Sequence, residues 1–128
     1  MTYLLDTCAL LGWWSQPERL SPSALSLIKD PENRCLVSAA SAWEVATKFR
    51  IGKYPQGSGV VADWEKRLME DGFDELAIGF KHALKAGTLP GDHRDPFDRM
   101  IAAQALLSNL SVLTCDPEIT GLGANTVW

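Results

Sequence analysis

Short apolar runs alternate along the chain with segments whose apolar residues recur at helical spacing. The runs have the length of strands, and they fall at residues 3–5, 35–37, 76–78, 112–113 and 127–128. Because helix-like segments separate them, the pattern predicts parallel strands joined by helical crossovers. We therefore expect an α/β fold, with a central parallel sheet of about five short strands flanked by helices.

Six helices are expected between and after these strands. The first follows Asp6, and the others are predicted at about residues 21–29, 41–52, 60–71, 79–86 and 96–108. The fourth of them ends at Gly72, because glycine is the usual residue just beyond a helix C-terminus. The fifth is expected to end at Gly87, and a loop containing glycine and proline follows over residues 88–94.

Length and composition indicate one domain. The 128 residues are 46% hydrophobic, so the chain can bury one core, and we expect residues 1–128 to form a single domain. No uncharged stretch approaches the ~20 residues of a membrane span, which favours a cytoplasmic protein with no membrane partner. The cysteines, Cys8, Cys35 and Cys115, are odd in number and widely spaced, so we expect buried thiols rather than disulfides or a zinc site.

The formal net charge of −4 argues against nucleic-acid binding by bulk electrostatics. Positive charge is nevertheless concentrated locally. Lys48, Arg50 and Lys53 fall within six residues that include no acid, and Arg94 and Arg99 flank an acidic motif. Either local basic rims or ordinary solvated surface charge accounts for these residues.

Four carboxylates occupy equivalent places relative to the predicted elements. Asp6 directly follows the first strand and Asp116 the fourth, while Glu44 lies in the first turn after the second strand and Asp98 in the first turn of the helix at 96–108. In a parallel sheet, helix N-termini and strand C-termini share one edge, where open α/β folds bind ligands. The four side chains are therefore expected to converge.

Helix capping alone explains each carboxylate taken singly. Ser41 and Glu44 fit a capping box, and Asp95 and Asp116 each precede a proline in the N-cap position. Gathered on one edge, however, carboxylates repel one another and raise each other's pKa unless a cation neutralises them. Oxygen ligands of this kind suit Mg²⁺ or Mn²⁺, so we interpret the cluster as a metal site. For Asp95 both interpretations stay open: a helix cap alone, or an additional acid of the cluster.

Such a metal site favours phosphodiester hydrolysis, since the ion polarises phosphoryl oxygens and activates water. Other chemistries lack their residues. His82 and His93 are the only histidines, neither accompanies a serine or cysteine nucleophile in a recognisable arrangement, and no phosphate-binding glycine loop is present. Lys48 and Arg99, near the acidic segments, are predicted to contact the substrate backbone.

Four segments resemble, in order, the four motifs of PIN domains. They read LLDT at residues 4–7, VSAASAWE at 37–44, HRDPFDRMIAAQA at 93–105 and LTCD at 113–116. The similarity is greatest to the VapC-like toxins of bacterial toxin-antitoxin pairs, especially the branch with the HRDPFDR segment. It implies a magnesium-dependent endoribonuclease in which Asp6 and Asp98 hold the metal most directly and Glu44 and Asp116 complete the acidic set.

The resemblance also implies three partners: an RNA substrate, a cognate antitoxin and a second copy of the chain in a homodimer. In that family the antitoxin lies across an apolar groove and reaches toward the acids. Because adjacent helical residues diverge by ~100°, Trp13 and Trp14 cannot both point into the core, so we expect one at the surface. Such a groove would also contain Leu20, Leu25, Ile28, Trp64 and Leu68. The alternative is that these residues simply close the core.

Two other functions fit part of the pattern. A haloacid-dehalogenase-type phosphatase also begins with an aspartate after the first strand, but it needs a second acid two residues later, where this chain has Cys8. A non-catalytic binding module with a PIN fold is the other alternative. The presence of all four acids weighs against it, and manganese binding that is lost in Asp6→Asn would separate the two.

Overall fold

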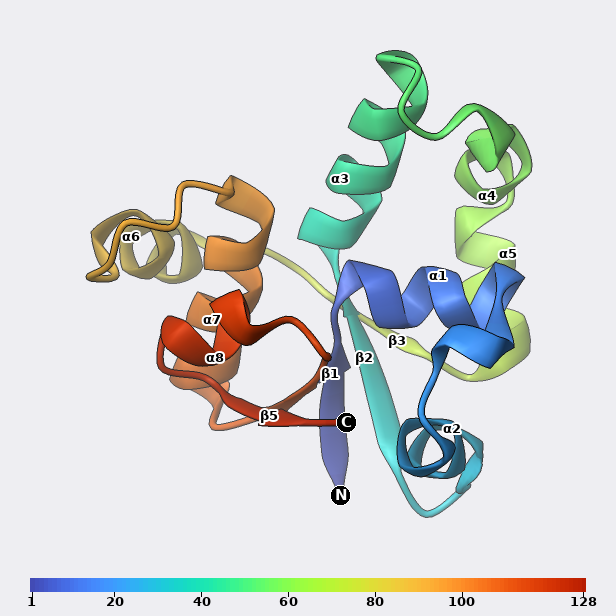
Figure 1. The fold of residues 1–128 in the computed structure, drawn as a ribbon, viewed down its shortest axis with the longest axis horizontal. Helices are drawn as coiled ribbons and strands as arrows, with labels where there is room; N and C mark the ends of the chain where they lie inside the picture. Colours follow the sequence, from blue (N-terminus) through green and yellow to red (C-terminus); the bar gives the residue numbers. More distant parts are fainter.

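Five parallel strands form one sheet in the computed structural model, which describes all residues from 1 to 128. Along the sheet their order is β3-β2-β1-β4-β5 (Figure 1). The strands are β1 (Thr2–Leu5), β2 (Arg34–Ser38), β3 (Asp74–Leu76), β4 (Ser111–Leu113) and β5 (Asn125–Val127). The predicted α/β fold with a short-stranded parallel sheet is therefore confirmed.

Eight α-helices and two short 3₁₀ helices connect and flank the strands. The α-helices are α1 (Thr7–Ser15), α2 (Pro22–Lys29), α3 (Ala39–Arg50), α4 (Ser58–Ala62), α5 (Trp64–Asp71), α6 (Phe80–Thr88), α7 (Pro96–Ser108) and α8 (Pro117–Gly121). The 3₁₀ helices are η1 (Pro17–Arg19) and η2 (Pro55–Gly57). None of these helices has the length and apolar character required to cross a membrane.

Alternate residues of the strands face two separate layers of helices. Tyr3 and Leu5 of β1 pack with α1, α2 and α5, whereas Leu4 between them packs with α6, α7 and α8 (Figure 1). This alternation follows from the two-residue period of a strand. Both faces are covered, as is usual for a parallel sheet, so its edge at the C-terminal ends of the strands is the natural place for a site.

The register places the ends of the three central strands side by side. Leu5 of β1 pairs with Val37 of β2 and with Leu113 of β4. Asp6 and Thr114 follow two of these positions directly in the sequence. The residues that begin the following helices are thus brought to one level of the sheet.

Several predicted boundaries are corrected by the structure. The third strand spans Asp74–Leu76 rather than 76–78, because its pairing with β2 aligns Leu76 with Ser38 and leaves two exposed acidic residues in an edge strand. The helix expected at 60–71 is two helices, α4 and α5, which meet at Asp63. Gly72 ends α5 in the left-handed conformation, as predicted, with φ of 69°.

The end of α6 also differs from the prediction. Gly87 lies inside the helix, which ends at Thr88. Leu89 has extended backbone angles, and Pro90 follows it. Since a proline disfavours helical angles in the residue before it, Pro90 accounts for this end better than Gly87 does.

Most residues of the predicted apolar groove close the core, although Trp64 and Leu68 also line a largely apolar cavity of about 310 Å³. Leu20, Ile28 and Leu68 are buried, and Leu25 and Trp64 pack against the same cluster while only partly buried. Trp13 and Trp14 are also only partly buried. The cysteine prediction is corrected as well: Cys35 is buried, but Cys8 and Cys115 are exposed.

Ser38 joins the start of α3 to the buried side of α7. Its hydroxyl accepts a hydrogen bond from Ala40 N at 3.0 Å, which makes it the N-cap of the helix. The same hydroxyl donates to Gln104 Oε1 at 2.5 Å, and Gln104 is fully buried. The Ser38 side chain therefore satisfies one backbone and one side-chain group inside the fold.

We predict that Ser38→Ala lowers the free energy of unfolding by about 2–3 kcal/mol, because it removes a cap and leaves a buried amide oxygen without a donor. Urea unfolding measures the change. Ser26→Ala, at an exposed position of α2, is the matched control and should stay within about 0.5 kcal/mol of the unaltered protein. Equal free energies of unfolding for the two variants would show that the hydrogen bonds of Ser38 contribute nothing to stability.

Candidate active site

Asp6 lies at the centre of the candidate site, where β1 passes into α1. Its Oδ1 accepts a hydrogen bond from Ala9 N at 2.6 Å and caps the helix, and Thr114 Oγ1 donates to Oδ2. The residue is only 4% exposed. Burial is the main cause that raises the pKa of this carboxyl to about 6, and the charges of Asp98 and Asp116 raise it further against the two hydrogen bonds.

Glu44 comes from α3, and the structure corrects its sequence interpretation. Because α3 begins at Ala39 with Ser38 as its cap, Glu44 lies in the second helical turn and is not part of a capping box. Ser41 is buried and accepts a hydrogen bond from Thr7 Oγ1 at 3.0 Å instead. The carboxylate of Glu44 is therefore free of any capping role.

One oxygen of the Glu44 carboxylate has no partner. Lys48 Nζ donates to Oε2 at 2.5 Å, whereas Oε1 is buried without any hydrogen bond. Buried polar atoms are almost always satisfied, so an orphaned carboxylate oxygen requires an explanation. A cation or a bound donor next to Glu44 would supply one.

Asp98 projects from the first turn of α7 and is oriented by His93. The Nε2 atom of His93 lies 2.8 Å from Asp98 Oδ2. Burial raises the pKa of Asp98, and the charges of Asp95, Asp116 and Glu44 add to it, while the hydrogen bond from His93 opposes them. That same bond raises the pKa of His93 and so favours its protonated, donating form. Sequence reasoning assigned no role to His93, although it begins the third resembling segment.

Asp116 and Asp95 both act as helix caps, as their sequence positions predicted. Asp116 Oδ1 accepts from Glu118 N at 2.9 Å at the start of α8. Asp95 Oδ1 accepts from the backbone N–H groups of Phe97 and Asp98 at the start of α7. The negative charges of both residues also raise the pKa of Asp98. Asp95 and Asp116 therefore belong to the acidic cluster even though each caps a helix.

Thr114 is a second residue that sequence reasoning missed. Its hydroxyl donates to Asp6 Oδ2 and accepts from Asp116 N at 3.0 Å, so it connects two of the predicted acids. The residue is buried directly after β4. Its position between Leu113 and Asp116, in the fourth resembling segment, was the one signal available in the sequence.

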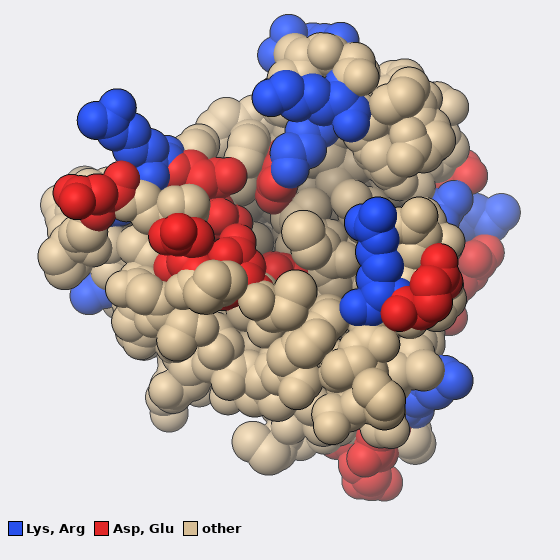
Figure 2. Space-filling view, in the orientation of Figure 1, with Lys and Arg blue, Asp and Glu red and all other residues tan.

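The four predicted acids thus influence one another electrostatically on the same edge of the sheet. Red atoms gather over the adjoining ends of α7 and α8 in Figure 2. No three histidine, cysteine or acidic side chains are placed so that they could hold a metal ion directly. The donors are nevertheless hard carboxylate oxygens, one of them orphaned. They fit Mg²⁺ or Mn²⁺, which bind through one or two carboxylates and keep several waters.

The two predicted substrate-binding cations differ in the structure. Lys48 is partly exposed and lies against the acids through its ion pair with Glu44. Arg99 instead donates to the backbone carbonyls of Ala86, Leu89 and His93. The guanidinium therefore holds the segment between α6 and α7, and it supports His93 rather than extending into solvent toward a substrate.

The PIN domain family model matches residues 3–124, which is nearly the whole chain. This chain belongs to the PIN domain family. Over 57 residues it is 33% identical to Ribonuclease VapC16 of Mycobacterium tuberculosis (strain ATCC 25618 / H37Rv), an alignment that covers 44% of this chain and 40% of that protein. The resemblance seen in the sequence is confirmed at the level of the family.

Solved structures share the fold over almost their full length. VapBC2 from Rickettsia felis, bound to a DNA fragment from its promoter, has a TM-score of 0.69 at 16% identity and covers 99% of this PIN domain and 98% of that chain. VapBC-1 from nontypeable Haemophilus influenzae has a TM-score of 0.65 at 20% identity, and the match covers 99% of this chain and 97% of that chain. FitAcB from Neisseria gonorrhoeae has a TM-score of 0.66 at 18% identity, and the match covers 100% of this chain and 97% of that chain.

We predict that Arg99→Met lowers the free energy of unfolding of the PIN domain by about 2 kcal/mol or more, because charged hydrogen bonds to three carbonyls are lost. Limited proteolysis should also cut residues 89–94 faster. Arg94→Met is the matched control, since Arg94 is exposed and close in sequence. If both variants resist protease and urea equally well, Arg99 does not hold this segment.

Proposed function

We propose that this PIN domain is a metal-dependent endoribonuclease and the toxin of a toxin-antitoxin pair. The observation that carries the proposal is the buried Glu44 carboxylate with its unpartnered oxygen, on the same sheet edge as three further acids. Carboxylates held together at that edge need a cation to offset their repulsion. The similarity to Ribonuclease VapC16 supports RNA as the substrate class.

The residues of the chain divide into those that would hold the ion and those that position them. Asp6, Glu44, Asp98 and Asp116 would surround Mg²⁺ or Mn²⁺, one or two of them as direct ligands and the others through water bound to the ion. The ion would polarise the scissile phosphate and activate water. Thr114 fixes the carboxylate of Asp6 through its hydroxyl.

His93 and Lys48 support two of these acids from outside. His93 orients the carboxylate of Asp98, and Lys48 places a positive charge 2.5 Å from Glu44. In the proposed reaction Lys48 also faces the phosphate backbone. Asp95 keeps its cap and adds negative charge beside Asp98.

We predict that the protein cleaves single-stranded RNA with Mg²⁺ or Mn²⁺ and not in chelator. Asp6→Asn and Asp98→Asn should each lower cleavage by more than the roughly 10- to 100-fold typical of residues that only support a metal ligand. Their stability should be unchanged or higher, because each removes like-charge repulsion. Gel analysis of a labelled RNA and thermal unfolding measure the two effects.

Asp95→Asn is the matched control for this series. Asparagine caps a helix about as well as aspartate, so activity should fall only mildly. If Asp95→Asn were inactive and Asp98→Asn active, the two roles would be reversed: Asp95 would be the metal-holding acid rather than Asp98. Cleavage at the unaltered rate in chelator would remove the metal mechanism, and Mn²⁺ binding without any cleavage would favour the non-catalytic module.

The proposed partners are a cognate antitoxin and a second copy of the chain. The solved complexes with this fold are described as VapBC, FitAcB and a toxin-antitoxin complex from Klebsiella pneumoniae. In this structure Phe80 and Leu84 lie one turn apart on α6 and are 74% and 65% exposed. We infer that this apolar face is the contact between two copies, because a helix face of this kind is normally covered.

We predict that Phe80→Glu converts a homodimer into a monomer, because it places a charge in an apolar contact, whereas Lys81→Glu at the neighbouring exposed position leaves the dimer intact. Light scattering measures the mass of each variant.

Co-expression with the product of an adjacent gene tests the antitoxin, which should copurify and block cleavage by occupying the acidic site. A complex as active as the free protein would contradict that mechanism.

A further inference from the structure

A cavity of about 410 Å³ lies between the end of α1 and the end of α3. Its charged lining residues are Arg19, Lys48 and Lys53, and Tyr54 supplies an aromatic wall. None of the residues that line it is acidic. We call this site the basic cavity; its volume is within the usual range of ligand pockets.

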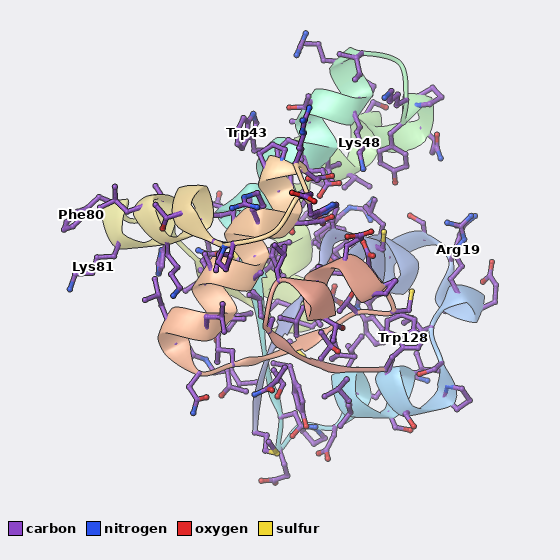
Figure 3. All side chains as sticks on the ribbon, turned by 60° about the vertical axis from the view of Figure 1, so that its left-hand side comes forward. Arg19, Trp43, Lys48, Phe80, Lys81 and Trp128 are labelled. Carbon is purple, nitrogen blue, oxygen red and sulfur yellow. The ribbon has the colours of Figure 1, made fainter.

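The basic cavity adjoins the carboxylate cluster through Lys48. This residue lines the cavity and also donates to Glu44 Oε2 at 2.5 Å. Arg19 and Lys48 come from η1 and α3, with α1 between these elements (Figure 3). Basic atoms lie across a hollow from the acidic ends of α7 and α8 in Figure 2. A chain that reaches the acids can therefore continue into the cavity.

Two of its cations have no carboxylate partner. Arg19 and Lys53 are exposed, and neither takes part in any of the ion pairs of the structure. In a chain with a net charge of −4, a hollow with three cations and no acid departs from the average surface. Such a hollow attracts phosphate, which the neighbouring carboxylates alone would repel.

The aromatic wall is held in place by a glycine. A Cβ atom added to Gly57 would lie 2.4 Å from Cδ2 of Tyr54, so the ring packs directly on the Gly57 backbone. Gln16 and Gln56 add amide groups that both donate and accept hydrogen bonds. Cations combined with an aromatic ring are the elements with which proteins bind single-stranded nucleic acid.

We propose that the basic cavity binds the nucleotide of single-stranded RNA that lies next to the scissile bond. Arg19 and Lys53 bind its phosphate, and Tyr54 contacts its base. The proposal rests on the proposed nuclease function and specifies where the substrate is held. It also explains how an acidic protein attracts RNA, since the attraction is local to one cavity beside the acids.

The test is RNA binding in chelator, where the carboxylate cluster holds no metal and no cleavage occurs. A fluorescent pool of random ten-nucleotide RNAs is titrated with the unaltered protein and with Arg19→Ala/Lys53→Ala, and anisotropy is followed over a range of salt concentrations. Affinity should fall about tenfold or more at low salt in the variant. The slope of log affinity against log salt should decrease in magnitude by about 0.7, because one phosphate of a single strand is no longer neutralised.

The control is Lys29→Ala/Lys81→Ala, which removes the same charge from exposed positions on α2 and α6. It should bind like the unaltered protein, and thermal unfolding verifies that both variants fold. Equal affinity of the two double variants would overturn the proposal, as would an absence of salt-dependent binding by the unaltered protein. Competition by polyglutamate as strong as that by RNA would also overturn it.

These outcomes are distinct from failure of the nuclease function. If the nuclease function fails, the unaltered protein shows no metal-dependent cleavage. The difference in RNA affinity between the cavity variant and its control would still be observed by anisotropy. Failure of the present proposal would appear as a protein that cleaves RNA while its cavity variant and its control bind RNA equally.

Discussion

Repulsion among carboxylates at one edge of the sheet is the constraint on which the rest of the site depends. The fold brings the acids together, and burial raises the pKa of Asp6 to about 6 with help from its like-charged neighbours. Each acid is then held by a specific donor: the hydroxyl of Thr114, the ammonium of Lys48, the imidazole of His93 or a backbone N–H group. The polar residues around the cluster are therefore arranged to hold charges that would otherwise move apart.

The sheet and the convergence of the acids followed from the sequence because both depend on chain-wide patterns. Alternating apolar runs and helical segments predict a parallel sheet, and a parallel sheet places Asp6 and Asp116 on the same edge whatever the details of their contacts. Helix α7 was predicted with its observed bounds, since Asp95 and the following proline mark its start. Local signals that agree with the overall topology are the ones that sequence reasoning uses well.

The errors arose where tertiary contacts override a local pattern. Ser38 and Ser41 are equally good caps by residue type, and only the pairing of β2 with β1 and β3, which ends with Ser38 opposite Leu76, fixes where the second strand ends. Leu20 and Leu68 have the same apolar character whether they line a groove or close a core. Thr114 and His93 have no periodicity that could mark them, because their roles depend on partners that are set by the fold. Arg99 was assigned to the substrate because nothing local indicates which carbonyls it reaches.

The bond between Thr114 and Asp6 has a consequence for the order in which the protein is made. It joins residues 108 positions apart, and β4 adds to the sheet beside the first strand of the chain. A ribosome that has synthesised the N-terminal two thirds of the protein has already released Asp6 and Glu44, yet neither Asp98 nor Thr114 exists. Since a domain generally folds as a unit, the acidic centre assembles only when translation is almost complete. On the proposed nuclease function, a truncated or still-growing chain lacks the complete acidic centre and leaves the RNA that encodes it uncut.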